Sequence, residues 1–129
     1  MEAVPFWLTD APGGMEATGF GLNARLRDYA RFGILYANDG VMGGKRILPS
    51  EWVSEATTPS NKSVMNGALY EGYPLGNQYH WWAFPGGSFE AQGVFGQLIF
   101  VNLEERLVIA TTSACPEAWI LDNEFEFMP

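Results

Sequence analysis

Residues 89–112 read FEAQGVFGQLIFVNLEERLVIATT, and the pattern of this stretch predicts three β-strands. Aromatic and β-branched residues favour strands over Phe89–Val94, Gln97–Asn102 and Leu107–Thr112. Leu103–Arg106, with three charged residues in a row, is typical of a hairpin connection. Leu107–Ala110 is a continuous apolar run, which predicts a central strand covered on both faces.

The strand pattern extends toward the N-terminus. Tyr79–Phe84 is a fourth candidate strand, and Pro85-Gly86-Gly87 after it is typical of a turn. Aromatic residues make up 15% of the chain and cluster in these strands, which favours packing in a sheet over a ligand-binding role. Residues 60–78 mix Gly, Pro, Asn and Ser, and we expect a loop there.

An amphipathic helix is expected upstream of the strands. Asn23 can cap it, and Asn38-Asp39-Gly40 can end it, because glycine adopts the left-handed conformation of a helix stop. Arg25, Asp28 and Arg31 fall largely off its apolar stripe. The stripe consists of Leu22, Leu26, Tyr29, Ala30, Gly33 and Tyr36.

A second, shorter helix is expected to open at Pro49–Val53, with Trp52, Val53 and Ala56 packing inward and Thr58–Asn61 closing it. Residues 1–21 are expected as a loop, 42–46 as a turn and 116–127 as a short C-terminal helix. Two helices followed by an antiparallel meander predict an α+β fold, with residues 1–129 in one domain.

Composition excludes several functional classes. Fifteen acidic residues against seven basic ones give a formal charge of −8, which disfavours nucleic-acid binding. One cysteine and one histidine, Cys115 and His80, allow neither an internal disulfide nor a structural zinc site. We expect no cofactor and no metal. No run approaches the roughly 20 apolar residues of a membrane span, and the sequence does not indicate a compartment.

Local motifs for catalysis are weak. An S-x-x-K pair is absent, because Met42 and Pro59 stand three residues before the two lysines, Lys45 and Lys62. Tyr36-Ala37-Asn38 matches a Y-x-N pattern, but Tyr36 belongs to the apolar stripe and is expected in the core.

Two further patterns have simple structural explanations. Cys115 with His80 could suggest a thiol enzyme, although a lone cysteine between Ala114 and Pro116 is more often a small apolar residue. Asn61-Lys62-Ser63 is a glycosylation sequon of a kind that is common by chance. In Gly93–Gln97, glycines bracket a bend, which favours a tight turn and also permits close backbone approach to a ligand.

Taken together, several blocks resemble a family of serine hydrolases. The family joins class C β-lactamases, related esterases, penicillin-binding peptidases and 6-aminohexanoate-dimer hydrolase. The resemblance spans about residues 5–116. The blocks that carry it, in order, are Gly19–Gly33, Asn38–Gly40, Arg46–Pro49, Trp52-Val53, Tyr79–Trp82 and Ala91–Gln97.

The resemblance implies acyl transfer by a Ser and a Lys of an S-x-x-K helix and a Tyr of a Y-x-N loop, all upstream of the residues present. It therefore implies an incomplete β-lactamase/transpeptidase-like fold that is inactive alone. The family's third motif falls on Ala91-Gln92-Gly93. A lysine that would attract a substrate carboxylate is replaced by Ala91, which favours a small ester or amide substrate without that carboxylate.

The residue after the motif, Val94, would supply a backbone N–H to the oxyanion hole, with Ala91–Gly93 and Phe95 contacting the substrate. The resemblance also implies that Leu107–Thr112 pairs with the missing N-terminal segment or with another copy of the chain. The alternative is a non-catalytic, degenerate homologue that acts as a binding or interaction module.

Overall fold

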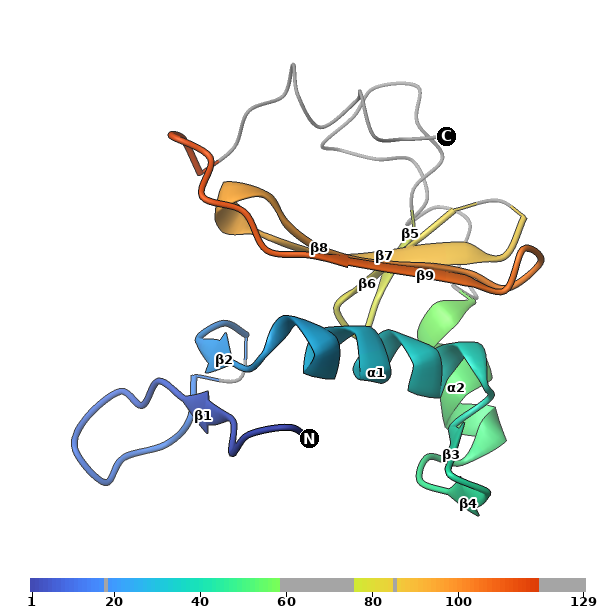
Figure 1. Ribbon diagram of the computed structural model, residues 1–129, viewed down its shortest axis with the longest axis horizontal. Coiled ribbons are helices and arrows are strands. Elements are labelled where there is room, and N and C mark those ends of the chain that lie inside the picture. The colour runs from blue at the N-terminus through green and yellow to red at the C-terminus, as the bar shows by residue number, and fades with distance from the viewer. Residues whose placement is uncertain (18, 59–75, 85, 119–129) are drawn as a thin grey trace.

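The computed structural model describes residues 1–17, 19–58, 76–84 and 86–118, and its architecture is α+β (Figure 1). A five-stranded antiparallel sheet has the order β5-β6-β7-β8-β9. Its strands are β5 (Gly76–Gln78), β6 (Trp81–Ala83), β7 (Ser88–Gly93), β8 (Gln97–Asn102) and β9 (Leu107–Thr111).

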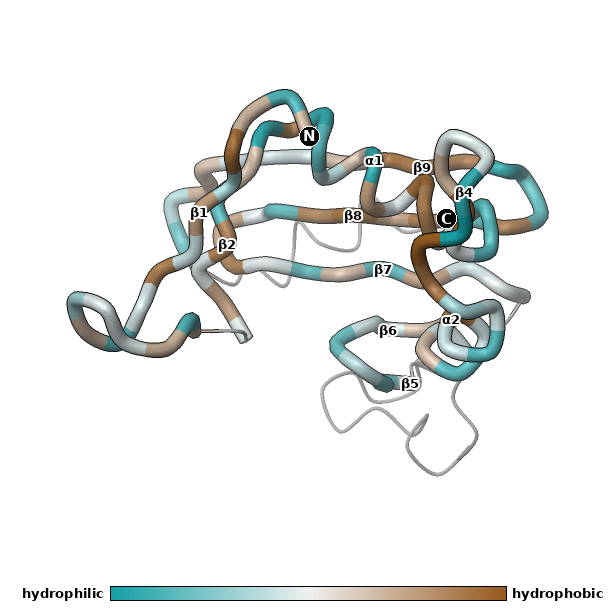
Figure 2. The backbone as a smooth tube through the Cα atoms, turned by 90° about the horizontal axis from the view of Figure 1, so that it is seen from below, coloured by the Kyte–Doolittle hydropathy of each residue, from teal (hydrophilic) through white to brown (hydrophobic). Residues whose placement is uncertain are grey.

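Two helices accompany the sheet. Helix α1 (Leu26–Ala37) lies across one face, over β8 and β9, and α2 (Ser50–Thr57) contacts β6 (Figure 2). Two small hairpins complete the described part, each of two paired strands. They are β1 (Phe6–Trp7) with β2 (Leu22–Asn23) and β3 (Val41–Met42) with β4 (Lys45–Arg46).

Strand register separates the side chains of the sheet into two faces, because successive residues of a strand point to opposite sides. Val101 and its neighbours Phe89 and Val108 face α1, and Val101 and Phe89 are almost completely buried. Glu90, Phe100 and Ile109 form the adjacent row on the opposite face. The main core therefore lies between α1 and the sheet.

Close packing between α1 and the sheet depends on Gly33. A Cβ atom on Gly33 would lie 2.7 Å from Val108 Cγ1, closer than real contacts allow, and 3.0 Å from Ile99 Cγ2, which is tighter than most contacts. Next to it, the rings of Tyr36 and Trp81 meet edge to face with centroids 4.8 Å apart, an arrangement that aromatic quadrupoles favour. The prediction that Tyr36 is a core residue is confirmed.

The end of α1 is confirmed and its predicted start is wrong. Gly40, at a φ of +75°, donates its N–H to Leu35 O at 2.8 Å and closes the helix. The helix begins only at Leu26. Asn23 lies in β2, where its side-chain amide donates to Gly21 O instead of capping.

The predicted apolar stripe of α1 is also wrong at two positions. Leu26 is exposed, whereas Asp28 is only 2% exposed. The carboxylate of Asp28 can be buried because it accepts hydrogen bonds from Glu2 N and from Arg31 Nη1.

Helix α2 forms where it was predicted, with Val53 and Ala56 buried as expected. Trp52 remains partly exposed and contacts the ring of Tyr79 instead of packing inward. The expected turn over residues 42–46 is the β3–β4 hairpin, whose Gly43 and Gly44 both have positive φ.

Three strand predictions need correction. Tyr79 and His80 both have positive φ and form the turn between β5 and β6, so the strand predicted over residues 79–84 begins at Trp81. Gly76–Gln78 is a strand where a loop was expected. Within the described residues, β9 pairs only with β8 and exposes Leu107 and Ile109, so in this part of the chain it is not the central strand covered on both faces that was predicted.

The other strand boundaries agree within one residue, and the turn predicted at Leu103–Arg106 is present. Residues 116–118 are not helical, and the rest of the helix predicted over 116–127 lies outside the described residues, as do the sequon at 61–63 and residues 60–75 of the predicted loop. Neither α1 nor α2 has the length and apolar character of a transmembrane span.

Candidate functional site

The candidate site is the bend that joins β7 to β8. Gly93 pairs with Gln97, and the three residues between them, Val94–Gly96, form one 3-10 turn. Phe95 and Gly96 have φ values of +62° and +83°, the left-handed conformations by which a three-residue connection reverses the chain. The bend therefore presents a strained backbone at the end of the strand.

Only glycine fits at the last position of the bend. A Cβ atom on Gly96 would lie 2.9 Å from Cys115 Sγ and 3.1 Å from Ser113 Cβ. The sequence alone indicated a glycine-bracketed turn here. The structure adds that the segment after β9 packs directly against that turn.

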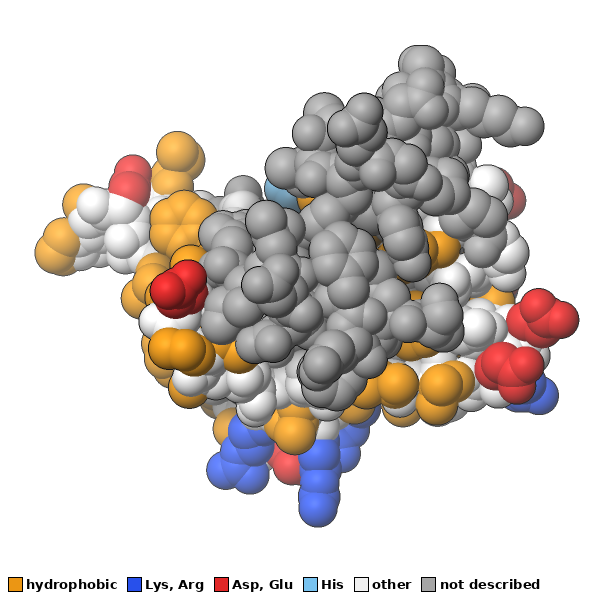
Figure 3. Space-filling model, turned by 90° about the horizontal axis from the view of Figure 1, so that it is seen from above, with side chains coloured by type: hydrophobic (Ala, Val, Ile, Leu, Met, Phe, Trp, Pro, Cys, Tyr) orange, Lys and Arg blue, Asp and Glu red, His pale blue; other side chains and the backbone are white. Residues whose placement is uncertain are grey.

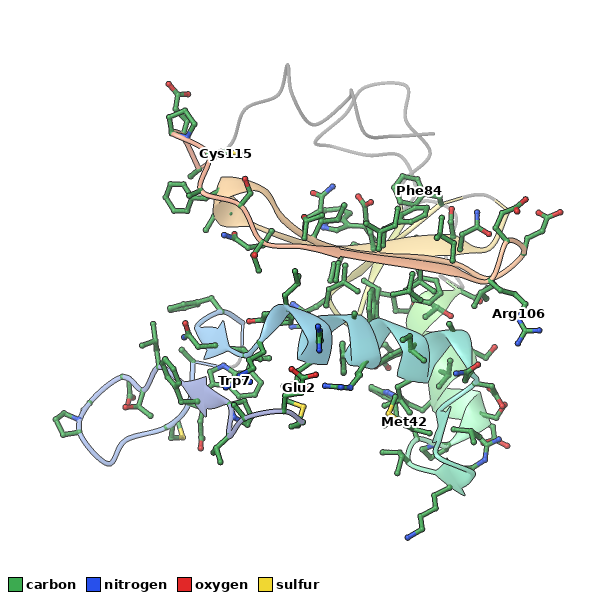
Figure 4. The ribbon with its side chains drawn as sticks, in the orientation of Figure 1. Glu2, Trp7, Met42, Phe84, Arg106 and Cys115 are labelled. Carbon is green, nitrogen blue, oxygen red and sulfur yellow. The ribbon has the colours of Figure 1, made fainter. Side chains whose placement is uncertain are left out.

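The same segment, which we call the brace (Thr112–Ala118), holds the bend by hydrogen bonds. Cys115 N donates to Phe95 O at 3.2 Å, and Phe95 N donates to Ala118 O at 3.1 Å. Gln97 Nε2 donates to Ser113 O at 2.9 Å. Figure 4 shows Cys115 beside the bend, at the opposite end of the sheet from Arg106. The brace thus holds the bend at Phe95 and at Gln97, the residue that follows it.

The predicted site residues Ala91, Gln92, Gly93, Val94 and Phe95 follow one another along the end of β7 and the bend. Ala91 faces α1 and packs against the core, so its side chain is turned inward. Gln92 lies on the opposite face. The side chains of Val94 and Phe95 are 45% and 42% exposed. Of the five predicted site residues, those open to solvent are therefore Gln92, in part, and the residues at the bend.

The position of Val94 suits a backbone donor. As the first residue of the 3-10 turn, its N–H has no carbonyl partner within that turn. Gly93 before it is extended, with φ of −118° and ψ of 157°. This extended conformation is also the one preferred before a proline. Val94→Pro would therefore remove the N–H without requiring a new backbone conformation at Gly93.

Charge is sparse around the bend. The end of β7, the bend and the brace carry one ionisable side chain besides Cys115, that of Glu117, and no Lys, Arg or His. No cation in these three segments can attract a substrate carboxylate. The described ranges also contain no group of three or more His, Cys, Asp or Glu side chains suited to holding a metal ion.

Glu90 is a buried acid that the sequence analysis did not single out. It is 4% exposed, two residues before Gln92 on the same face of β7, and its Oε1 accepts a hydrogen bond from Gln92 Nε2 at 2.5 Å. The sequence did contain a signal for Glu90, because an acidic residue stands between Phe89 and Ala91 within a predicted strand. Glu90 positions the one predicted polar side chain of the site.

The geometry does not support the alternative of a thiol enzyme that uses Cys115 and His80. Cys115 Sγ is 3.4 Å from Ser113 Oγ, and no hydrogen bond joins it to His80. His80 is exposed in the β5–β6 turn, on the other side of β7 from the strands that Cys115 follows. The two side chains therefore do not form a thiol–imidazole pair.

A second charged group lies at the start of α1, on the rim where Figure 3 shows basic side chains gathered. The Glu2 carboxylate is 2.9 Å from Arg31 and 3.5 Å from Arg27. The hydrogen bond from Arg31 is the main cause that lowers the pKa of Glu2. Every carboxylate and guanidinium here is paired, which is typical of a structural ion-pair network.

Asp28 is the buried member of this network. Burial acts to raise its pKa, but the hydrogen bonds from Glu2 N–H and from Arg31 outweigh burial and leave the pKa below its usual value. Asp28 is therefore ionised in the folded protein at neutral pH.

Comparison with known proteins gives a structural match only. No protein-family model and no curated protein matches the chain. Among solved structures, one described as "Putative 6-aminohexanoate-dimer hydrolase from Bacillus anthracis" is 30% identical, with a TM-score of 0.74. The match covers 93% of this chain and 30% of that one, so the chain spans less than a third of the length of the matched structure. The likeness supports a β-lactamase-like hydrolase fold.

Proposed function

We propose that residues 1–129 form the C-terminal part of a serine hydrolase similar to class C β-lactamases and 6-aminohexanoate-dimer hydrolase. It would act by acyl transfer on a small ester or amide. In this proposal the chain contributes the third-motif strand, β7, and the Val94 N–H as one donor of the oxyanion hole. The nucleophilic Ser, its Lys and the Tyr of the Y-x-N loop would come from polypeptide outside these residues.

The observation that carries the proposal is the bend after Ala91-Gln92-Gly93, within a fold similar to that of a structure named as a hydrolase. Catalysis of acyl transfer needs a donor fixed where negative charge develops on the carbonyl oxygen. The brace fixes the bend through three backbone or side-chain hydrogen bonds before any substrate arrives. Such preorganisation is what makes an oxyanion donor effective.

The absence of Lys, Arg and His from the bend and the brace supports a neutral ester or amide as substrate. A β-lactam carries a carboxylate, and a site without a cation would bind it weakly. Exposed Val94 and Phe95 would offer apolar contact to the acyl or leaving group.

The proposal is tested in a full-length hydrolase that contains this segment. Val94→Ala keeps the amide, so we expect turnover within a few fold of the parent. Val94→Pro removes the N–H and should lower kcat by about 10²–10³, the usual loss for one oxyanion donor. Proline suits the first position of a helical turn that follows an extended residue, so the fold should persist.

Circular dichroism and thermal melting must show both variants folded before their rates are compared. A folded Val94→Pro enzyme with near-normal kcat would rule out the amide as a donor. A folded Val94→Ala enzyme as inactive as the proline variant would show that the isopropyl group, and not the amide, matters.

The alternative, a non-catalytic homologue that binds a ligand or partner, is favoured by one observation. The 129 residues contain no S-x-x-K pair. The gene sequence immediately upstream decides between the two. A continuous reading frame with S-x-x-K supports the hydrolase, and its absence supports the binding module.

A further inference from the structure

The face of the sheet that is turned away from α1 carries a polar pair on β7. Glu90 is 4% exposed, and its Oε1 accepts a hydrogen bond of 2.5 Å from Gln92 Nε2. The two residues are two positions apart on one strand, so both side chains stand on the same face. Gln92 is the partly exposed member of the pair. Glu90 therefore holds a side chain that a ligand can reach.

Apolar neighbours strengthen this hydrogen bond. In the strand register Glu90 lies between Trp82 of β6 and Phe100 of β8, and Phe100 is buried. Leu98 lies opposite Gln92. A hydrogen bond is stronger where water is largely excluded, and a buried carboxylate that loses a partner raises the free energy of the folded state. The orientation of the Gln92 amide is therefore fixed before a substrate arrives.

A fixed amide presents a defined group to a ligand. The amide of a glutamine is planar, with an NH₂ group that donates and a carbonyl oxygen that accepts. Because Nε2 is turned toward Glu90, Oε1 lies on the side of the amide turned away from Glu90. Within the described part of the chain no hydrogen bond reaches this oxygen. The pair therefore offers an acceptor.

We propose that Gln92 Oε1 accepts a hydrogen bond from an N–H group in the acyl part of the substrate, and that Glu90 is the positioning residue that keeps this oxygen turned outward. The inference rests on the proposed function, in which the reacting carbonyl oxygen lies at the Val94 N–H. Gln92 and Val94 are two residues apart, about 7 Å along the strand at roughly 3.4 Å per residue. The substrate N–H would thus stand a few bonds from the reacting carbonyl.

This acceptor distinguishes an N–H from an oxygen of the same size. An ester oxygen in that place would face Gln92 Oε1 as one acceptor faces another, and both would lack a partner. A site built to form a hydrogen bond rejects an analogue without the bonding group more strongly than it rejects a small change in apolar shape. Gln92 and Glu90 therefore determine which acyl group is preferred, and the chemical step belongs to other residues.

Two p-nitrophenyl esters that differ in one group test this preference in the full-length hydrolase. One is the ester of N-acetyl-β-alanine, whose acyl chain carries an N–H, and the other is the ester of 3-acetoxypropanoic acid, with oxygen in that place. Both have the same leaving group and chain length. After spontaneous hydrolysis is subtracted, kcat/KM should be about three- to tenfold higher for the N–H ester, the value of one neutral hydrogen bond.

Gln92→Leu removes the acceptor. The ratio of the two kcat/KM values should then fall to about one, through a loss on the N–H ester of roughly the value of that hydrogen bond. The oxygen ester should keep its kcat/KM. Gln78→Leu is the matched control, because it makes the same change in β5, which does not pair with β7. It should leave the ratio unchanged.

Glu90→Gln tests the positioning role without a change of size. A glutamine at position 90 donates as well as accepts, so the Gln92 amide can turn round and offer Nε2 to the oxygen ester. The ratio should fall because kcat/KM for the oxygen ester rises, which a general loss of structure would not produce. Glu90→Asp, whose carboxylate is one methylene too short to reach Gln92, is a second variant and should also lower the ratio.

Circular dichroism and melting must show each variant folded. A ratio that Gln92→Leu leaves unchanged, in an enzyme that Val94→Pro inactivates, overturns this inference and leaves the proposed function standing. A ratio that falls with Gln92→Leu but with neither Glu90 variant overturns the positioning role of Glu90. If the parent turns over neither ester, the proposed function fails, and this inference fails with it.

Discussion

Gly96 shows how one residue determines the candidate site. Its φ of +83° is a conformation that a residue with a Cβ atom adopts only at a cost of about 1–2 kcal/mol. Its missing side chain also makes room for Cys115 and Ser113 of the brace. The shape of the bend therefore depends on a glycine that no other residue can replace without movement of the brace.

Gly96→Ala should lower the free energy of unfolding by about 2–4 kcal/mol, since the backbone cost is joined by overpacking against Cys115. Gly43→Ala is the matched control. Gly43 has a φ of +57° but open space around its Cβ direction, so we expect a loss of about 1 kcal/mol. Urea denaturation measures both. Equal losses would show that the brace does not confine Gly96.

Asp28 gives the stability a pH dependence of known sign. Its folded-state pKa lies below the ordinary 3.8, so its stabilising contribution is present above about pH 4 and is lost as pH falls through the folded pKa. Asp28→Asn should therefore be less stable than the parent at pH 7, and the difference should shrink toward pH 3. Urea unfolding at pH 3 to 8 tests this, with exposed Glu104→Gln as control. A difference that does not change with pH would contradict it.

Between elements, the contact of α1 with β8 and β9 is governed by the missing side chain of Gly33. Glycine is poor within a helix, costing about 1 kcal/mol relative to alanine. It is present here because a Cβ atom would press on Val108 and Ile99. Packing against the sheet has outweighed the intrinsic preference of the helix.

Gly33→Ala should destabilise the protein by about 1–2 kcal/mol, because overpacking of up to about 3 kcal/mol exceeds the gain in helix propensity. In a Val108→Ala background the nearest clashing atom is gone. The cost of Gly33→Ala should then fall by about 1 kcal/mol or more, a coupling measured by a double-mutant cycle. Additive effects would mean that α1 shifts away from the sheet instead of pressing on Val108.

For the molecule as a whole, the proposed function predicts that the isolated chain is inert. An oxyanion donor without the Ser and Lys leaves only a residual part of the rate enhancement. Assays with chromogenic lactams and p-nitrophenyl esters should show no saturable turnover. Turnover that a serine-directed phosphonate blocks would contradict this expectation and place a nucleophile within these 129 residues.

The elements that local sequence determines were predicted well. The strands at Gln97–Asn102 and Leu107–Thr111, the turn between them and the glycine stop of α1 depend on neighbours within a few residues. The candidate site at Ala91–Phe95 was expected from the family resemblance and not from local sequence, and which of its side chains turns inward depends on how the sheet packs against α1.

Tertiary structure alone decided the rest, because each remaining feature depends on residues far apart in the chain. The apolar run of β9 indicates a buried strand, yet whether a strand is central or at an edge is set by which strands pair with it. Asp28 is polar, but contacts with Glu2, 26 residues away, permit its burial. Local sequence thus determined the elements and the bend, while pairing and packing over long distances determined the edge, the buried acids and the brace that fixes the bend.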